Sequence, residues 1–327
     1  MNRAAARRFS IVVPVRDKLQ FLKPCLDSLM VAVDQFGESE IIIVDNNSAP
    51  ETAEFLKVRY ADRAILLHST AATVSAVRNL GASHATGTVL CFVDSDCIVP
   101  ADYLHRVADT LDANRPAAVG HQVRLPGLTW IDRCWHDLHF IPKQGEVPWL
   151  NGACLNVTAH AFRAVGGFRE DLISGEDVDL SERLVQAGFR VESSPSLVIT
   201  HLDNPSSAVE FFRKEWWRGL GLWTAGDLRR DRIRSLGLTH VALSVMAVAG
   251  AVLLPVPVAV RVAGALGSTL LAPTAAVAHR QRQLRAAGKP VNRVGILLSG
   301  IALYCLYFWA RGLAAIMASV TVRQSIR

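Results

Sequence analysis

The sequence predicts an α/β fold with a mostly parallel, doubly wound sheet, followed by a C-terminal region of apolar helices. Over residues 1–205, short apolar runs rich in Val and Ile alternate with segments of helical spacing, which is typical of repeated βα units. From residue 236 onward, long apolar stretches dominate the chain. We therefore predict three parts, namely an α/β domain over 1–205, an amphipathic aromatic and basic interfacial segment over 206–235, and a membrane domain over 236–327.

Strands and helices are expected to alternate in chain order. Strands are predicted at 11–15, 40–44, 64–67, 88–93, 117–123, 153–157 and 198–201. Helices are predicted at 22–33, 51–59, 74–85 and 101–113, and a short helix after Thr158 should end at Gly166-Gly167. Pro24 is compatible with the first helix if it lies in the first turn. The segment 128–140, rich in Trp and His, is expected to line a cleft or a core.

Charge and cysteine content restrict the environment of the chain. The net charge is +6, and arginine is concentrated after about residue 213, which favours a membrane surface over nucleic acid as the basic region's partner. The six cysteines form no Cys-x-x-Cys pair and indicate reduced core residues in a reducing compartment. The apolar run at 11–15 is too short for a signal peptide, so we expect the first half to stay in the cytoplasm.

Two carboxylates follow the buried strand predicted at 88–93. Asp94 and Asp96 are two positions apart, and in an extended backbone they would point to the same side. Ligands bind at the C-terminal ends of strands in open α/β sheets, and carboxylates with substrate phosphates typically hold Mg²⁺ or Mn²⁺. The pattern therefore indicates a metal–diphosphate site. An Asx-rich turn without a ligand is the alternative.

Other polar residues also follow predicted strands. Asp45 is placed to accept hydrogen bonds from a ribose or a base. The sequence contains neither glycine-rich phosphate-loop motif, so the phosphates would be neutralised by the metal and by Arg78. As the alternative, Arg78 is a solvated helix residue. His201 is either a metal or phosphate contact or an ordinary histidine.

A second acidic cluster begins at Ser174 and contains Glu176 and Asp177. Acidic residues in the first turn of a helix interact favourably with the helix dipole, and this structural role is sufficient to explain them. As the functional alternative, one of these carboxylates is held over a cleft as a general base.

Several motifs in one order make the chain similar to family 2 glycosyltransferases with the Rossmann-like GT-A fold, over roughly residues 9–220. They are Ser10-Ile-Val-Val-Pro-Val15, Ile41-Ile-Ile-Val-Asp-Asn-Asn-Ser48, Arg78-Asn-Leu-Gly-Ala82, Val93-Asp-Ser-Asp96, Gly166-Gly-Phe168 and Gly175-Glu-Asp-Val-Asp-Leu180. The resemblance implies an inverting enzyme that takes a sugar from a nucleotide-diphosphate donor.

The resemblance also implies roles for individual residues. The nucleotide would be held by Pro14, Val15, Asp45, Arg78 and Asp94. The divalent cation would be held by Asp96, as the more direct ligand, with Asp94 and His201. Asp177 would be the catalytic base, supported on the acceptor side by Glu176 and Trp149. The chain departs from the family in having Lys18 where Glu is frequent. It also lacks the Gln-x-x-Arg-Trp motif of processive synthases, so we expect transfer of a single sugar.

The segment 206–235 mixes aromatic and basic side chains. A capping box at Ser207-Ala-Val-Glu210 opens a helix that contains Phe211, Trp216 and Trp217, with Lys214 and Arg218 between them. Such a mixture also occurs on nucleic-acid-binding surfaces. Because a long apolar run follows directly, an interfacial position at a membrane is the better interpretation, and no nucleic-acid partner is expected.

The apolar region predicts a multi-pass protein of the inner (plasma) membrane. Residues 237–278 are long enough for a hairpin of two spans of about 20 residues each, with a turn at Pro255-Val-Pro257. A basic loop at 279–293 and a third apolar helix at 294–322 follow, and the third helix either spans the membrane or lies at its surface. Tyr304, Tyr307 and Arg311 recur on one face of this helix.

Three functions are compatible with these features. The first is transfer of a sugar from a nucleotide-sugar donor to a hydroxyl of a lipid-linked or glycan acceptor at the membrane. A polyprenyl-phosphate glycosyl synthase is the second, although an ionised phosphate acceptor needs no base. The third is a membrane translocase whose first domain binds a nucleotide without catalysis, which would not require the full set of acidic residues.

Overall fold

The computed structural model describes residues 8–114, 116–121, 123–127, 129–141, 143–220, 228–253, 257–289 and 294–325. The chain divides into two compact units. The first comprises Met1–Pro126, Pro142–Leu172 and Glu176–Asp203, and the second comprises Gly127–Ile141, Ile173–Gly175 and Asn204–Arg327. The second unit thus includes the segment 127–141, which the sequence analysis had placed in the first domain. The three-part domain boundaries themselves stay a prediction.

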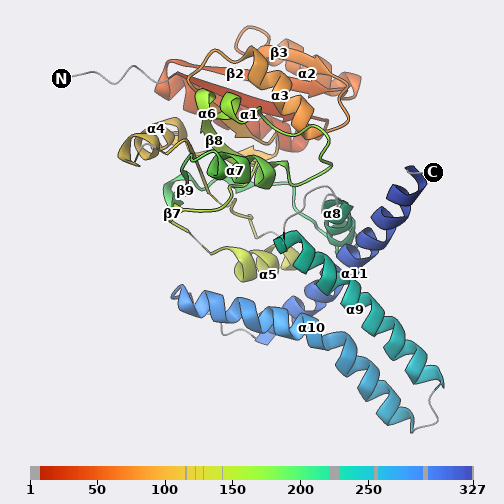
Figure 1. The fold of residues 1–327 in the computed structure, drawn as a ribbon. Helices are drawn as coiled ribbons and strands as arrows, with labels where there is room; N and C mark the ends of the chain where they lie inside the picture. Colours follow the sequence, from red (N-terminus) through yellow and green to blue (C-terminus); the bar gives the residue numbers. More distant parts are fainter. Residues whose placement is uncertain are drawn as a thin grey trace. The chain divides into compact units, whose positions relative to one another are not determined.

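One eight-stranded sheet forms the centre of the first unit (Figure 1). Its strands are β1 (Phe9–Val15), β2 (Ser39–Asn46), β3 (Ile65–Ser69), β4 (Val89–Val93), β6 (Ala118–Gly120), β7 (Gly145–Glu146), β8 (Cys154–Thr158) and β9 (Val191–Ser193). Their order across the sheet is β3-β2-β1-β4-β8-β6-β9-β7. The first four strands in this order are parallel, and antiparallel β8 joins β4 to β6. The predicted α/β class with a mostly parallel sheet is confirmed.

Alternating residues of the strands face two layers of helices. Ile11 and Val13 pack in one core with the helices α1 (Leu19–Phe36), α2 (Pro50–Tyr60) and α4 (Tyr103–Asn114). Val12, between them, faces the opposite layer, formed by α3 (Val74–His84), α6 (Ala159–Ala164) and α7 (Glu176–Gln186). Because side chains of a strand alternate in direction, the continuous apolar runs of the sequence are explained by burial on both faces.

The helix boundaries show one confirmed and one wrong local prediction. Thr158 caps α6 as predicted, because its hydroxyl accepts a hydrogen bond from the backbone N–H of Ala161 at 3.3 Å. Pro24, in contrast, does not lie in the first turn of its helix, because α1 begins at Leu19. Pro24 therefore removes one helical hydrogen bond in the second turn.

A small antiparallel ribbon lies outside the main sheet. It pairs β5 (Cys97–Ile98) with β10 (Thr200–His201), and the 3₁₀ turn η1 (Pro195–Leu197) precedes β10. The strand predicted at 198–201 thus forms this ribbon and does not extend the main sheet. The ribbon brings residues that are about one hundred positions apart in the sequence into direct register.

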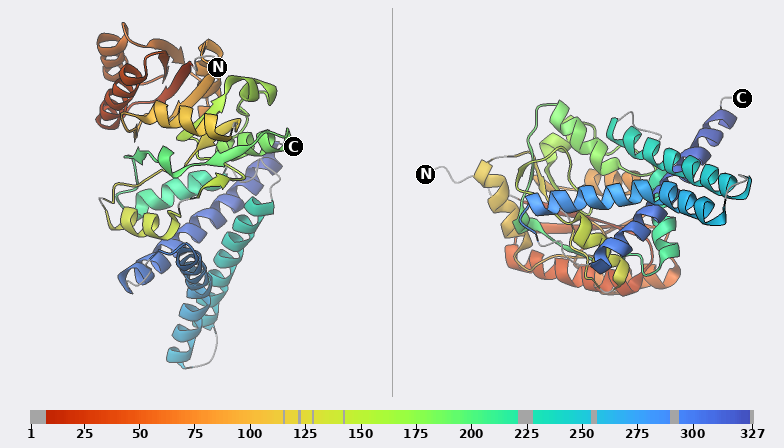
Figure 2. Two further views of the ribbon diagram at one scale, coloured as in Figure 1. Left: turned by 90° about the vertical axis from the view of Figure 1, so that its left-hand side faces the viewer. Right: turned by 90° about the horizontal axis from the view of Figure 1, so that it is seen from below.

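The second unit is helical. Its helices are α5 (Trp130–His139), α8 (Ala208–Leu220), α9 (Leu228–Leu253), α10 (Val258–Ala286) and α11 (Val294–Ser325). Figures 1 and 2 show α9 and α10 side by side and antiparallel, as a hairpin requires, while the connecting residues 254–256 lie outside the described part of the chain. Among the described residues, two helical stretches are long and apolar enough to cross a membrane, Val258–Ala286 and Leu297–Ala318. The apolar part of α9, Ser235–Gly250, is shorter.

The predicted basic loop at 279–293 is wrong in its first part, because α10 continues to Ala286. The helix then ends in a Schellman motif at Gly288, whose φ is +69°. The N–H of Gly288 donates to the carbonyl of Arg285, and the N–H of Lys289 donates to that of Leu284. The basic residues within 280–285 are therefore part of α10, the helix that begins in the apolar stretch.

The core of the second unit contains the residues that the sequence placed on one face of the third apolar helix. Tyr304 and Tyr307 of α11 pack against Trp135 of α5, which confirms a core position for this part of the 128–140 segment. Arg311 of α11 forms an ion pair with Glu215 of α8 at 2.7 Å, and both side chains are buried. The face that carries Tyr304, Tyr307 and Arg311 is therefore directed toward other helices of this unit.

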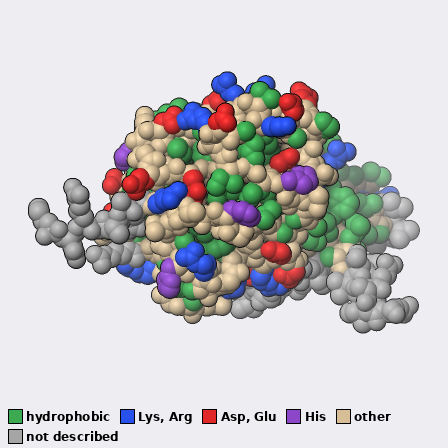
Figure 3. All heavy atoms as spheres, turned by 90° about the horizontal axis from the view of Figure 1, so that it is seen from above, with side chains coloured by type: hydrophobic (Ala, Val, Ile, Leu, Met, Phe, Trp, Pro, Cys, Tyr) green, Lys and Arg blue, Asp and Glu red, His purple; other side chains and the backbone are tan. Residues whose placement is uncertain are grey.

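The surface face shown in Figure 3 carries acidic and basic side chains in alternation around small hydrophobic patches. Among the described side chains on this face, no large patch of one charge is visible. An extended basic surface is the usual electrostatic requirement for nucleic-acid binding. The described side chains on the face in Figure 3 do not form such an extended basic surface.

Candidate active site

The two carboxylates that follow β4 lie in a turn and not in an extended strand. β4 ends at Val93, and the N–H of Cys97 donates to the carbonyl of Asp94 at 3.0 Å, which closes a four-residue turn. The extended backbone assumed for 94–96 is therefore wrong, and side chains two positions apart need not point the same way. Asp94 and Asp96 indeed have different partners.

Asp94 is held by a buried arginine. Arg78, on α3, is only 3% exposed; its Nη2 lies 2.6 Å from Oδ1 of Asp94, and its Nη1 lies 2.6 Å from Oε1 of Glu176. Burial alone would lower the pKa of Arg78, but the attraction of Asp94 and Glu176 outweighs it and raises that pKa above its ordinary value. Arg78 is therefore a bridge between two carboxylates, which excludes the alternative of a solvated helix residue.

Asp177 occupies the first turn of α7, beside this bridge. Its Oδ2 accepts a hydrogen bond from the N–H of Gly152 at 2.9 Å, and its Oδ1 accepts one from the N–H of Val178 at 2.8 Å. Burial and the charge of Glu176 raise the pKa of Asp177 to about 6, although the two N–H groups and Arg78 oppose the rise. The structure thus holds a carboxylate that changes its protonation state just below neutral pH.

A side chain at Gly152 would crowd the residues of this site. A Cβ atom added there would lie 3.2 Å from Cβ of Asp177 and 3.3 Å from Nη2 of Arg78. Trp149, which was predicted to support the base, is half-buried in the same segment. The contact to Asp177 comes from the backbone of Gly152, which sequence reasoning missed because a backbone donor has no side-chain signature.

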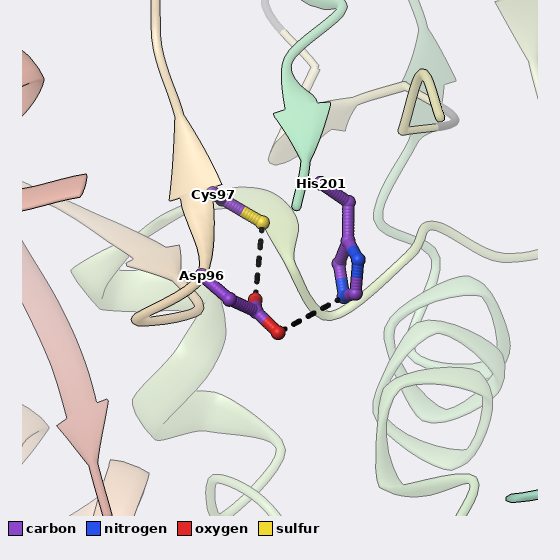
Figure 4. Close-up of side chains that lie close together, drawn as sticks. All are labelled: Asp96, Cys97 and His201. Carbon is purple, nitrogen blue, oxygen red and sulfur yellow. Dashed lines mark hydrogen bonds and ion pairs between the residues drawn. The ribbon is translucent and has the colours of Figure 1, made fainter. Parts of the chain in front are cut away.

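Asp96 belongs to a separate cluster with Cys97 and His201 (Figure 4). Nε2 of His201 lies 3.4 Å from Oδ2 of Asp96, and Sγ of Cys97 lies 3.7 Å from Oδ1 of the same carboxylate. One ligand atom from each of the three residues lies within 4.8 Å of the others. Oxygen, nitrogen and sulfur donors so close together are suited to a divalent cation, so the predicted pairing of Asp96 with His201 fits such an ion.

The predicted nucleotide residues lie at the C-terminal ends of β1 and β2. Val15 and Asp45 are in register between these strands, and Oδ1 of Asp45 accepts a hydrogen bond from the N–H of Ser48 at 3.1 Å. The side chain of Val15 is only 1% exposed, so it offers a ligand its backbone groups alone, whereas Pro14 is half-buried. A cavity of about 150 Å³ lies beside Asp45 and His68.

Three non-glycine residues in the loops after these strands have left-handed backbone conformations. They are Asp17, Lys18 and Asn47, with φ of 57°, 60° and 54°. This conformation costs about 1–2 kcal/mol per residue and is concentrated at functional sites when the surrounding structure enforces it. Here two hydrogen bonds join the loops: the N–H of Asp17 donates to the hydroxyl of Ser48, and the N–H of Ala49 donates to Oδ1 of Asp17. Lys18, the departure from the family pattern, forms an ion pair with Asp203.

Residues 10–162 match the family model described as glycosyl transferase family 2. The glycosyltransferase AglE of Haloferax volcanii is 25% identical over 243 residues, which cover 70% of this chain and 78% of the relative. The pre-mycofactocin glycosyltransferase of Mycobacterium tuberculosis is 26% identical over 212 residues, which cover 60% of this chain but only 43% of the relative.

The fold is also similar to solved structures. The mannosyltransferase PcManGT from Pyrobaculum calidifontis, solved in complex with GDP-Man and Mn²⁺, aligns with a TM-score of 0.57 at 18% identity. The alignment covers 97% of this chain and 87% of the mannosyltransferase. At this identity the likeness concerns the fold alone, and it agrees with the GT-A architecture expected from the sequence motifs. The family match and these relatives together identify residues 10–162 as a glycosyltransferase domain of family 2, and the fold agrees with this assignment.

Proposed function

We propose that this enzyme transfers a single sugar, with inversion, from a nucleotide-diphosphate sugar to a hydroxyl group of a membrane-associated, lipid-linked acceptor. The observation that carries the proposal is the carboxylate of Asp177, held by two backbone N–H groups with its pKa raised to about 6. A general base works best when its pKa lies near the working pH, because it is then both largely ionised and basic enough to take a proton.

In the proposed reaction, Asp177 takes the proton of the acceptor hydroxyl. The acceptor oxygen forms a bond to the anomeric carbon as the bond from that carbon to the diphosphate oxygen breaks. Attack from the side opposite the leaving diphosphate inverts the configuration at that carbon. The Arg78–Glu176 ion pair positions the start of α7, so that the base next to Glu176 is held in place during the transfer.

The donor would bind along the C-terminal ends of β1, β2 and β4. The strained loops at 17–18 and 47, together with Asp45, offer a rigid site for the nucleoside. The mannosyltransferase with a similar fold was solved with a nucleotide sugar, which supports this donor class.

Asp96 and His201 would hold a divalent cation, Mg²⁺ or Mn²⁺, whereas Asp94, predicted as a further ligand, is paired with Arg78 and is not part of this cluster. The cation, when bound, supplies positive charge to the leaving diphosphate.

Features of the second unit support a membrane acceptor. Two stretches, Val258–Ala286 and Leu297–Ala318, have the length and hydropathy of spans. No Asp or Glu follows Asp231 in the sequence, whereas Arg and Lys continue to the end, so the flanks of these helices are basic. Basic flanks favour the cytoplasmic side. We therefore place the enzyme in the inner membrane as a multi-pass protein with its catalytic domain in the cytoplasm.

The two alternative functions receive less support. Membership of an enzyme family favours transfer over a translocase with a non-catalytic nucleotide-binding domain. A polyprenyl-phosphate synthase would use an acceptor that is already ionised. Asp177 would then have no acceptor proton to remove.

The experiment incubates inside-out membrane vesicles that contain the enzyme with a panel of labelled nucleotide sugars. The enzyme should transfer label from one of these sugars into the extractable lipids. Transfer should require a divalent cation and should be lost with excess chelator or in Asp96→Ala, because both remove charge from beside the leaving diphosphate. The matched control is Asp102→Asn, which changes an exposed acid just before α4 and should leave transfer unchanged. Full transfer in excess chelator would contradict the proposed cation, and label that enters no lipid would contradict the proposed acceptor.

The rate of transfer should rise with pH and level off above the pKa of Asp177, which lies at about 6. Protonated Asp177 cannot accept the hydroxyl proton, so each unit of pH below that value should lower kcat/KM for the acceptor about tenfold. The measurement is a pH–rate profile at low acceptor concentration, with the folded fraction monitored by circular dichroism over the same range. A flat profile through this range, with the fold intact, would exclude Asp177 as the base.

A further inference from the structure

We propose that Cys97 is a ligand of the cation site, bound as a thiolate, and that it makes this site prefer a softer divalent cation such as Co²⁺ or Zn²⁺ over Mg²⁺. The inference rests on the cation assigned under the proposed function and adds a residue and a selectivity to it. In the sequence, Cys97 is indistinguishable from the other cysteines that are expected in the core. Only the fold shows that it lies close to two candidate ligands, Asp96 and His201.

The first argument is the register of the small ribbon. Cys97 and His201 are direct partners in the antiparallel pair β5–β10. Side chains of directly opposed residues lie on the same face of a ribbon, about 4.5–5.5 Å apart at Cβ. Asp96 precedes Cys97 in the turn and reaches both of them, so the three donor groups converge on one point (Figure 4).

The second argument is the rigidity of the backbone that carries these donors. The N–H of Leu202 donates to the carbonyl of Asp96 at 2.8 Å, and the N–H of His201 donates to that of Arg124 at 2.9 Å. The turn bond from Cys97 to Asp94 fixes the third residue. Binding sites on paired strands are more precise than sites on free loops, so the small adjustment from 4.8 Å spacing to metal contact can come from side-chain rotation.

The third argument is the position of the sulfur. Cys97 is 0% exposed and packs in the main apolar core, whereas the side chains of Asp96 and His201 are each 18% exposed. The inner side of the cluster is therefore formed by sulfur, and its polar contact there is the carboxylate of Asp96. The outer side of the cluster is formed by the carboxylate of Asp96 and the imidazole of His201.

The chemistry of this donor set predicts its selectivity. Mg²⁺ prefers oxygen ligands and releases its waters reluctantly, whereas Zn²⁺ and Co²⁺ accept thiolate, imidazole and carboxylate together. A thiolate that replaces an oxygen ligand therefore shifts the preference from Mg²⁺ toward these ions. Coordination releases the thiol proton to the solvent.

Spectroscopy of the full-length protein with Co²⁺ tests the ligand directly. Purified protein in detergent is titrated with Co²⁺ alone, and the near-ultraviolet band for charge transfer from sulfur to cobalt is recorded. The wild type should show this band, and Cys97→Ala should bind Co²⁺ without it. The matched control is Cys25→Ala, because Cys25 is equally buried and its Sγ lies 3.4 Å from the carbonyl of Asp94, yet it is not part of the cluster. This control should keep the band.

Competition between ions tests the selectivity. Cys97→Ser keeps a polar side chain of similar size, and it should lower the affinity for Cd²⁺, a thiolate-binding ion used as the probe for soft cations, by at least about 10–100-fold while changing that for Mg²⁺ only a few-fold. Binding of Co²⁺ by the wild type without a sulfur band, or equal losses of Cd²⁺ and Mg²⁺ affinity in Cys97→Ser, would overturn the role of Cys97 and leave the cation site standing. Absence of any binding by the wild type would overturn the cation site as well.

Discussion

Replacing Asp177 by Asn should lower transfer to a hydroxyl acceptor by about 10²–10⁴-fold, because general-base catalysis is typically worth that factor. The fold should survive the change. Asn has one acceptor oxygen in place of two, so it can keep the hydrogen bond from Gly152 or the one from Val178 but not both. The change leaves one N–H of this buried site without its acceptor, which costs about 1–3 kcal/mol. Donor affinity should stay close to that of the wild type, since Asp45 and the Asp96 cluster are unchanged.

The experiment measures donor binding by calorimetry and the transfer rate on the same purified protein. The matched control is Asp171→Asn, which neutralises an exposed acid paired with Arg169 in the segment before α7 and should leave both quantities unchanged. If Asp177→Asn transfers sugar within a few-fold of the wild type, Asp177 is not the base. An acceptor that is already ionised, such as a polyprenyl phosphate, would then be the better hypothesis.

Replacing Arg78 by Met should lower the free energy of unfolding by about 3–5 kcal/mol, which is the usual cost of removing one partner from a buried ion pair. Met has a similar length, so the packing on Phe168 is largely kept while the charge is lost. Two carboxylates then face each other without a counterion. The lower end of the range is expected, because Asp94 is 30% exposed and water can solvate it, so that Glu176 accounts for most of the cost.

Denaturant unfolding gives the stability difference, and Arg106→Met is the matched control. Arg106, on the exposed side of α4, pairs with Asp102 and donates to the carbonyl of Ser196, and both contacts are solvent-exposed, so its loss should cost no more than about 1 kcal/mol. The pH–rate profile gives an independent readout. Arg78 lowers the pKa of Asp177, so its removal should shift the midpoint of that profile to higher pH. An unchanged midpoint together with unchanged stability would show that the bridge has no energetic role.

Most of the fold follows from patterns that the sequence displays directly. The parallel strands β1, β2 and β4 are largely buried on both faces, and this requires the uninterrupted apolar runs that predicted them. The end of α10 differs from the prediction, because the basic residues after 279 indicated a loop although they continue the helix. Arg, Gln, Leu and Ala are all good helix formers, and Gly288 was a visible stop signal that places the end correctly.

The candidate site was predicted less completely, for reasons that lie in its geometry. The sequence identified Asp94, Asp96 and Asp177 but not which residues they contact. The turn after β4 separates the two aspartates, and Asp-Ser-Asp is a turn-forming sequence that could have indicated it. The sequence does not distinguish a cysteine that only packs in the core from a cysteine that lies beside a carboxylate and a histidine. The strand register that distinguishes them exists only in the fold.

The buried ion pair between Glu215 and Arg311 has a consequence for how the protein is made. Arg311 lies within the apolar stretch Leu297–Ala318, and an arginine at the centre of an isolated inserting helix costs about 2.5–3.5 kcal/mol. Its partner lies on α8, which leaves the ribosome well before α11 does. A carboxylate is thus already synthesised when the guanidinium emerges. Under the membrane placement proposed above, the order of these helices along the chain would allow Arg311 to be neutralised as α11 is delivered, so that this helix would not enter a bilayer with an uncompensated charge.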